Sequence, residues 1–237
     1  MAAGGGGGGG GGNAFLATTA EDAALNQYWY SAPTLAAMLR ELDALPDGCR
    51  VAFLSTPSVF FSWLAAPGAS EETRAARGAA RHALLDLDTQ WATTPGFHKW
   101  DFTKPTEGFD AAGLTGAFDA VVMDPPFITT EVWEAYAVAA RALCSRPAAT
   151  APGAGEAAAA AVSTETEGAA DATAAAAVFP GKVLASTIVE NEALMARLFG
   201  ATPTRFQPSI PHLVYQYNFY TNFPPTALAA RNPEIPE

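Results

Sequence analysis

The sequence has few of the residues on which several classes of protein depend. Its 237 residues include two cysteines, Cys49 and Cys144, which excludes a disulfide scaffold and a cysteine zinc site. Thirteen basic side chains stand against 24 acidic ones, a formal net charge of −11. A protein whose main role is to bind nucleic-acid phosphates carries a basic face, so this balance argues against nucleic acid and favours a basic partner.

Long apolar segments and glycine-rich nucleotide loops are also absent. The longest apolar runs contain proline, glycine or charge before about 18 residues, so no membrane-spanning helix is expected. The first residues lack the basic region and apolar core of a secretory signal, and we expect a soluble cytoplasmic protein. No P-loop occurs, and the glycine run near the amino terminus follows no predicted strand, so it cannot serve as a G-x-G-x-x-G nucleotide loop. The histidines His82, His98 and His212 have no metal-ligand spacing, so no metal is expected.

Two segments of biased composition bound the foldable part of the chain. Residues 1–20 contain an unbroken glycine run, which predicts a disordered tail. Residues 146–178 are rich in alanine and contain no aromatic residue, which predicts an inserted surface loop. We therefore expect one domain over residues 21–230, interrupted by this insertion and followed by a short tail, 231–237.

Helix and strand patterns alternate in the rest of the chain. Helices are predicted at 34–45, 59–66, 131–143 and 190–199, and strands at 50–54, 83–88, 96–102, 118–123, 182–187, 205–206 and 214–219. Such alternation predicts an α/β fold, a mostly parallel sheet with helices on both faces.

Polar residues follow four successive predicted strands. Ser55 and Ser58 follow the first strand, Asp88 the second, Asp101 the third and Asp124 the fourth. Ligands of parallel sheets bind outside the carboxyl ends of the strands. A solvated turn explains any one of these residues, but four consecutive cases favour a ligand-binding edge.

The turn Asp124-Pro125-Pro126-Phe127 has the chemistry of an amine site. Its two prolines fix two φ angles and remove two backbone donors, so the neighbouring carbonyls are rigidly directed. The carboxylate and a carbonyl together can accept from an N–H group, and Phe127 offers a flat face. This arrangement suits an amine whose lone pair must point at an electrophile. The plainer interpretation is a turn that merely ends a strand.

This turn resembles the [DN]PP[FY] signature of class I S-adenosylmethionine-dependent amino-methyltransferases. With Gln27-Tyr28-Trp29-Tyr30-Ser31 and Leu54-Ser55-Thr56-Pro57-Ser58-Val59, the chain resembles a eukaryotic family once described as N6-adenine-specific DNA methyltransferases. That family is now understood as lysine methyltransferases of translation elongation factor 1-alpha. The resemblance spans residues 26–223. It implies a Rossmann-like domain with a seven-stranded, mostly parallel sheet and an antiparallel late strand.

The resemblance also implies where S-adenosylmethionine binds. Ser55, Pro57 and Ser58 form the first loop, where most class I methyltransferases have glycines against the amino-acid part of the cofactor. Asp88 would accept from the ribose hydroxyls, with Asp86 as the alternative if the strand ends earlier. Asp101 and Phe102 would lie beside the adenine. No metal is implied.

For the methyl acceptor, the resemblance implies that Asp124 and the Pro125 carbonyl orient an amine, with Pro126 in the turn and Phe127 packed on the substrate. A lysine ammonium must lose a proton before it can react, and a desolvated pocket promotes that loss. Tyr28, Trp29 and Tyr30 could wall such a pocket. They could equally form a hydrophobic staple before the helix that follows Ser31.

The resemblance thus implies a protein-lysine N-methyltransferase that acts on elongation factor 1-alpha, and a monomer is the default expectation. Two alternatives stay open. One is an N6-adenine nucleic-acid methyltransferase that uses the same turn to hold a flipped base. The other is a non-catalytic binding module with a methyltransferase-like fold, which the absence of glycine from the first loop allows.

Overall fold

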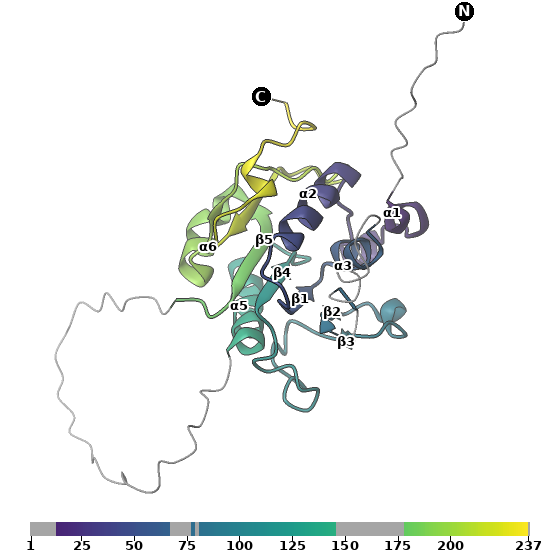
Figure 1. Cartoon of the computed structure of the whole chain (residues 1–237), viewed down its shortest axis with the longest axis vertical. Coiled ribbons are helices and arrows are strands. Elements are labelled where there is room, and N and C mark those ends of the chain that lie inside the picture. The colour runs from purple at the N-terminus through teal and green to yellow at the C-terminus, as the bar shows by residue number, and fades with distance from the viewer. Residues whose placement is uncertain (1–12, 67–76, 79–80, 146–177, 237) are drawn as a thin grey trace, which may run out of the picture.

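The computed structural model describes residues 13–66, 77–78, 81–145 and 178–236. Seven strands of these residues form one sheet in the order β3-β2-β1-β4-β5-β7-β6 (Figure 1). The strands are β1 (Val51–Leu54), β2 (Ala83–Asp86), β3 (Phe97–Lys99), β4 (Ala120–Met123), β5 (Lys182–Ile188), β6 (Thr202–Pro203) and β7 (Tyr217–Thr221). Apart from Val178, the predicted insertion lies outside the described residues.

The central strands run parallel and are buried along their whole length. β1 pairs in parallel with β2 and β4, which pair in parallel with β3 and β5. Every residue of β1, β2 and β4 is buried, as expected of strands covered on both faces. β7 pairs antiparallel with β5 and β6. The predicted Rossmann-like α/β sheet with an antiparallel late strand is confirmed.

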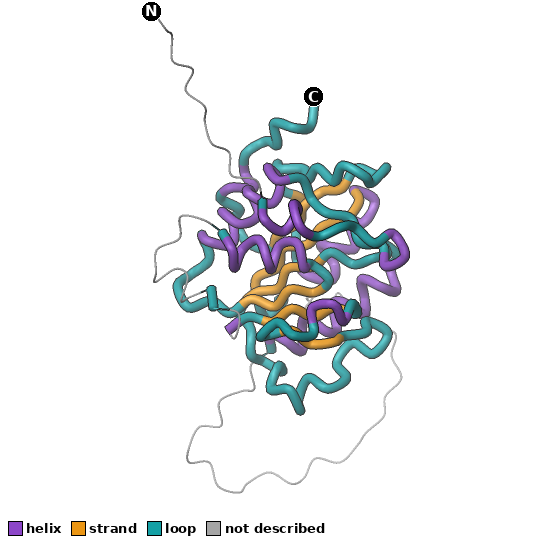
Figure 2. Tube along the Cα trace, turned by 90° about the vertical axis from the view of Figure 1, so that its right-hand side faces the viewer, coloured by secondary structure: helices purple, strands orange, loops and turns teal. Residues whose placement is uncertain are grey.

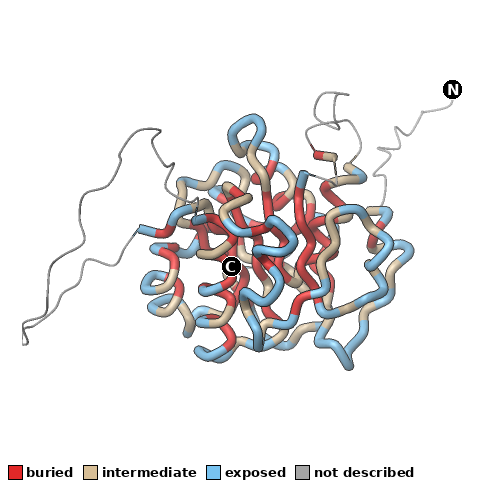
Figure 3. Tube along the Cα trace, turned by 90° about the horizontal axis from the view of Figure 1, so that it is seen from below, coloured by how far each residue is buried: buried red, intermediate tan, exposed pale blue. Residues whose placement is uncertain are grey.

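Helices cover both faces of the sheet (Figure 2). α2 (Ala32–Asp43) and α3 (Pro57–Ala65) pack against the face that includes Val51 and Phe53 of β1. α5 (Thr130–Cys144) and α6 (Glu192–Phe199) pack against the opposite face, which includes Ala52 and Leu54. Alternate residues of one strand therefore belong to two cores. Figure 3 shows the buried positions gathered in the middle of the molecule.

The amino-terminal prediction differs from the structure over residues 13–20. Here a short helix, α1 (Ala14–Thr18), replaces the predicted disordered tail, and the Asn13 side chain accepts from Leu16 N at 3.1 Å. Phe15 is buried, with its ring centroid 5.2 Å from Trp29 and 5.8 Å from Phe61. An aromatic cluster built from distant segments thus holds this helix in place.

The carboxyl-terminal residues also pack onto the domain. Asn232, in the predicted tail, is buried and donates to Gln207 O at 2.8 Å. Thr226 and Leu228, which precede Asn232 in the chain, donate their backbone N–H groups to the carboxylate of Glu41 on α2. A buried carboxylate that meets these donors ties the end of the chain to α2.

The strand boundaries differ from the prediction in ways that affect the site. β2 ends at Asp86, before Asp88, and β3 ends at Lys99, before Asp101. Residues 205–206 are not a strand, because Phe206 N donates to Leu228 O outside the sheet. β7 begins at Tyr217, and the residues from 207 to 216 form a loop. Among the described residues, no helix is long and apolar enough to cross a membrane.

Candidate active site

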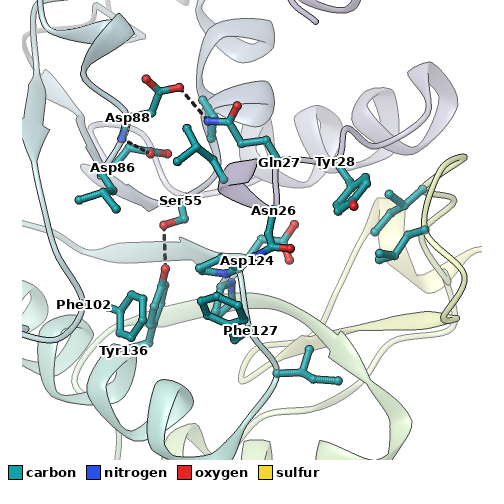
Figure 4. A pocket seen from close by; sticks show the side chains of 18 of the residues that line it. Asn26, Gln27, Tyr28, Ser55, Asp86, Asp88, Phe102, Asp124, Phe127 and Tyr136 are labelled. Atoms are coloured by element: carbon teal, nitrogen blue, oxygen red, sulfur yellow. Dashed lines mark hydrogen bonds between the residues drawn. The ribbon is translucent and has the colours of Figure 1, made fainter. Parts of the chain in front are cut away.

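A cavity of about 340 Å³ lies at the carboxyl ends of β1, β2 and β4 (Figure 4). β1 and β4 are neighbours at the point where the strand order reverses, since the chain builds β2 and β3 on one side of β1 and β4 on the other. Ligands of open α/β sheets bind at such a switch point. Ser55 and Asp124 follow β1 and β4 there, and Asp124 N donates to Leu54 O at 3.3 Å.

The structure brings most of the predicted site residues together around this cavity. Those that line it are Tyr28, Trp29, Ser55, Pro57, Asp86, Asp88, Asp101, Phe102, Asp124, Pro125, Pro126 and Phe127. Two predicted residues do not line it. Ser58 is buried in the first turn of α3, and Tyr30 is buried with its ring against Phe219.

The first loop adopts a glycine-like conformation without glycine. Ser55 has φ +54°, in the left-handed region that non-glycine residues seldom occupy. Its hydroxyl shares a hydrogen bond of 2.7 Å with the hydroxyl of Tyr136, which α5 supplies from a fully buried position (Figure 4). Burial raises the pKa of Tyr136, so its phenol stays neutral. This bond, which the sequence did not reveal, fixes the turn that leaves β1.

Two carboxylates lie at the carboxyl end of β2 and differ in environment. Asp86 is the last residue of β2 and is buried, which raises its pKa to about 6. β2 thus ends earlier than predicted, which is the case in which Asp86 is the alternative ribose acceptor. Asp88 N donates to Asp86 Oδ1 at 2.9 Å. Burial pushes the pKa of Asp88 upward, but hydrogen bonds from Gln90 and Gln27 outweigh that effect and leave the pKa below its ordinary value.

Gln27 is a further residue of the cavity wall whose role the sequence did not indicate. Its Nε2 donates to Asp88 Oδ2 at 2.9 Å. Because an ionised carboxylate only accepts, this bond fixes the orientation of the amide. Its Oε1 is buried and finds no hydrogen-bond partner among the described residues. A buried acceptor left open beside two carboxylates is suited to a ligand that brings donors.

Asp124 is the carboxylate at the centre of the site. Its Oδ2 accepts from the Tyr30 hydroxyl at 2.7 Å. Burial raises the pKa of Asp124 to about 7, and the bond from Tyr30 acts in the opposite direction. Burial is also the main reason that the pKa of Tyr217 is raised, with the Asp124 charge as the next cause. A carboxylate that titrates near neutral pH in a cavity is typical of a functional site.

Aromatic residues from two distant segments cover the cavity. Tyr28 and Trp29 come from the residues before α2, and Tyr215 and Tyr217 come from the loop before β7 and from β7 itself. Glu21 joins the two segments, since one of its oxygens accepts from Trp29 N at 2.8 Å and the other lies 2.6 Å from His212 Nδ1. The sequence predicted a strand at 214–219 but did not place its aromatic residues over the site.

The cavity is strongly acidic. Four aspartates line it, and no lysine, arginine or histidine occurs among the described residues that do so. Asp101 is fully exposed, and hydrogen bonds from the backbone and side chain of Thr103 lower its pKa. Within the described part of the chain, no group of three or more His, Cys, Asp or Glu residues could hold a metal ion. The site therefore favours cations and hydrogen-bond donors over phosphates.

A seven-stranded sheet with a late antiparallel strand and a ligand cavity at the β1–β4 switch point has the architecture of the Rossmann-like methyltransferase fold. The family model described as "Probable N6-adenine methyltransferase" matches residues 21–225. The chain belongs to this family. A search of the curated proteins gave no match.

Methyltransferases of this family generally use S-adenosylmethionine, and the residues around the cavity fit it. Asp86 and Asp88 are acceptors for the donor hydroxyls of a ribose, and Gln27 Oε1 is an unpartnered buried acceptor in the same wall. Phe102 offers an aromatic face, with its ring centroid 6.1 Å from that of Tyr136. When bound, this cofactor would supply an electrophilic methyl group on a positively charged sulfur, and that sulfur leaves as a neutral thioether when a nucleophile attacks the methyl carbon.

Proposed function

We propose that the chain is a protein-lysine N-methyltransferase that uses S-adenosylmethionine. The observation that carries this proposal is the acidic, aromatic-walled cavity around Asp124, which has no cationic side chain among its described lining residues. A cationic amine bound there is stabilised by the negative charge of the carboxylate and by the faces of the aromatic rings. A polyanionic substrate finds no comparable stabilising charge in this cavity.

The chain's own residues have three tasks in this mechanism. Asp124 and the rigid Pro125 carbonyl accept from the target amine and orient its lone pair. Tyr28, Trp29 and Tyr217 exclude water, and the resulting desolvation favours the neutral amine that is able to react. Phe127, which is 48% exposed, packs on the entering side chain at the mouth.

For the protein substrate we propose translation elongation factor 1-alpha. This step is supported by the resemblance carried by Gln27–Ser31 and Leu54–Val59, and by the net charge of −11, which suits a basic partner. We also propose, on the sequence features alone, that the protein is a cytoplasmic monomer.

A second candidate is methylation of N6 of adenine in nucleic acid. The description of the matched family favours it, and the exposed ring of Phe127 could stack on a flipped base. The acidic lining of the cavity counts against it, because the phosphates beside a flipped base need cations to neutralise them. We therefore rank it below the lysine acceptor.

The direct test is intact-protein and peptide mass spectrometry of elongation factor 1-alpha after incubation with the protein and S-adenosylmethionine. We expect a gain in multiples of one methyl group, mapped to a lysine. Asp124→Ala should abolish this gain and leave the affinity for S-adenosylmethionine nearly intact, as measured by calorimetry. No gain on the elongation factor would remove this substrate from the proposal.

Calorimetry also tests whether the chain is an enzyme at all. We expect wild-type protein to bind S-adenosylmethionine. If it binds none, a non-catalytic module with a methyltransferase fold becomes the better interpretation. If Asp124→Ala loses cofactor binding and folding together, Asp124 is a structural residue.

A further inference from the structure

Tyr30 is held rigidly beside the amine site although it does not line the cavity. Its side chain is 2% exposed, and its ring centroid lies 5.7 Å from that of Phe219. The next residue, Ser31, is fixed twice, since its N–H donates to Ser209 O at 2.8 Å and its side chain caps α2 by accepting from Thr34 N. The phenol of Tyr30 therefore has little freedom to move.

The Tyr30 hydroxyl is committed to one oxygen of Asp124. The donor and Asp124 Oδ2 are 2.7 Å apart, an ordinary distance for a hydroxyl that donates to a carboxylate. Asp124 lines the cavity, and its second oxygen, Oδ1, finds no hydrogen-bond partner among the described residues. The two oxygens of this carboxylate are thus distinguished, one held by the protein and one left for a ligand.

We propose that Tyr30 is the positioning residue of the amine site, whose hydroxyl holds Asp124 Oδ2 and presents Oδ1 to the target amine. This inference rests on the proposed function. A carboxylate free to rotate could accept the amine in several orientations, and only some of them direct its lone pair correctly. The bond from Tyr30 removes that freedom before the substrate arrives.

The same bond keeps Asp124 in the form that can receive a cation. Burial favours the neutral carboxyl, and donation from Tyr30 favours the carboxylate. The other titratable groups that act on or face Asp124 are the phenols of Tyr136 on α5 and Tyr217 on β7, with Asp86 across the cavity. None of the described lining residues is basic, so Tyr30 is the main side-chain group that stabilises the ionised form.

The test compares Tyr30→Phe with Tyr220→Phe. The control removes a similarly buried phenol that belongs to the core on the opposite face of the sheet. Its hydroxyl donates to Ile188 O at 3.2 Å. kcat/KM for methylation of elongation factor 1-alpha is measured against pH for both variants and the wild type. Tyr30→Phe should move the acidic limb of this pH profile upward by about one pH unit. The loss should be about fivefold at pH 7, approach about tenfold at lower pH and be largely recovered in alkali. Tyr220→Phe should leave the limb in place.

A second readout does not depend on activity. Proteins labelled with carbon-13 at the aspartate carboxyl are titrated by NMR, and the Asp124 signal is assigned by its absence from Asp124→Asn. The pKa of Asp124 should rise by about one unit in Tyr30→Phe and stay unchanged in Tyr220→Phe.

The two readouts separate this inference from the proposed function. If wild-type protein methylates no lysine, the proposed function fails and the NMR titration alone decides about Tyr30. If transfer occurs but neither the limb nor the Asp124 pKa moves in Tyr30→Phe, Tyr30 has only a packing role. Equal losses at every pH in both phenylalanine variants would likewise overturn the positioning role.

Discussion

Replacing Asp124 by Asn should stabilise the free protein, and the gain should grow with pH. The pKa of Asp124 is raised from 3.8 to about 7, mainly by burial. A group with a raised folded pKa contributes stability that is complete below its unfolded pKa and is lost as pH rises through the folded pKa. The shift of about three units corresponds to about 4 kcal/mol above pH 7. Asn carries no charge and avoids this loss, and its side-chain oxygen can still accept from Tyr30.

The assay is thermal unfolding of wild type and Asp124→Asn without cofactor, between about pH 5 and about pH 8. Across this interval linkage predicts that the advantage of the variant grows by about 2–3 kcal/mol, or on the order of 5 °C or more in Tm for a domain of this size. Asp86, whose pKa is also raised, is present in both proteins and cancels.

Asp101→Asn is the matched control. It removes an aspartate from the same cavity, but one that is fully exposed and has a lowered pKa, so its replacement should give no advantage that grows with pH. A constant difference between wild type and Asp124→Asn over the whole range would refute the argument that the folded protein holds this carboxylate at a cost in stability.

Three further outcomes follow from the structure. Asp86→Asn should weaken S-adenosylmethionine binding by at least about tenfold in calorimetry, because Asp86 is the buried carboxylate at the end of β2. This loss of affinity should exceed that of Asp88→Asn; a larger loss in Asp88→Asn would assign the ribose role to Asp88. Phe15→Ala should lower the free energy of unfolding by about 3 kcal/mol in urea, because it empties an aromatic cluster; no change would mean that α1 does not pack in solution. Glu41→Ala should lower the free energy of unfolding by about 3 kcal/mol in the same assay, because it leaves the buried N–H groups of Thr226 and Leu228 unpaired. It should also speed proteolysis after residue 221, and proteolysis equal to that of wild type would contradict this anchor.

The order of the helices and strands could be predicted because the burial of each element shows in the local pattern of apolar residues. Val51–Leu54 and Ala120–Met123 are continuous apolar runs, and such runs between polar turns indicate central parallel strands. The turn after each run then follows from the sheet itself, which places Ser55 and Asp124 side by side.

The contacts that complete the site could not be predicted, because they join distant segments. Tyr136 lies on the apolar side of a helix and resembles any core residue until Ser55, 81 positions away, supplies its partner. Tyr30 looks like a pocket wall in sequence, and only the tertiary structure turns its hydroxyl to Asp124, 94 positions away.

Residues 13–20 and 205–206 were mispredicted for a related reason. Five helical residues around Phe15 are too few to give a periodic signal, and their stability comes from aromatic rings elsewhere. Residues 205–206 have strand-like composition, but Phe206 pairs with Leu228 and not with a strand. Tertiary partners override weak local propensity in both cases.

The central claim is that the Asp124 site transfers methyl groups to an amine of protein. The most direct measurement adds the protein and S-adenosylmethionine with a labelled methyl group to a cell extract, then separates protein from nucleic acid and counts both. We predict label in protein, recovered after hydrolysis as methyl-lysine and lost with Asp124→Ala. Label that enters nucleic acid as N6-methyladenine, with none in protein, would contradict the account.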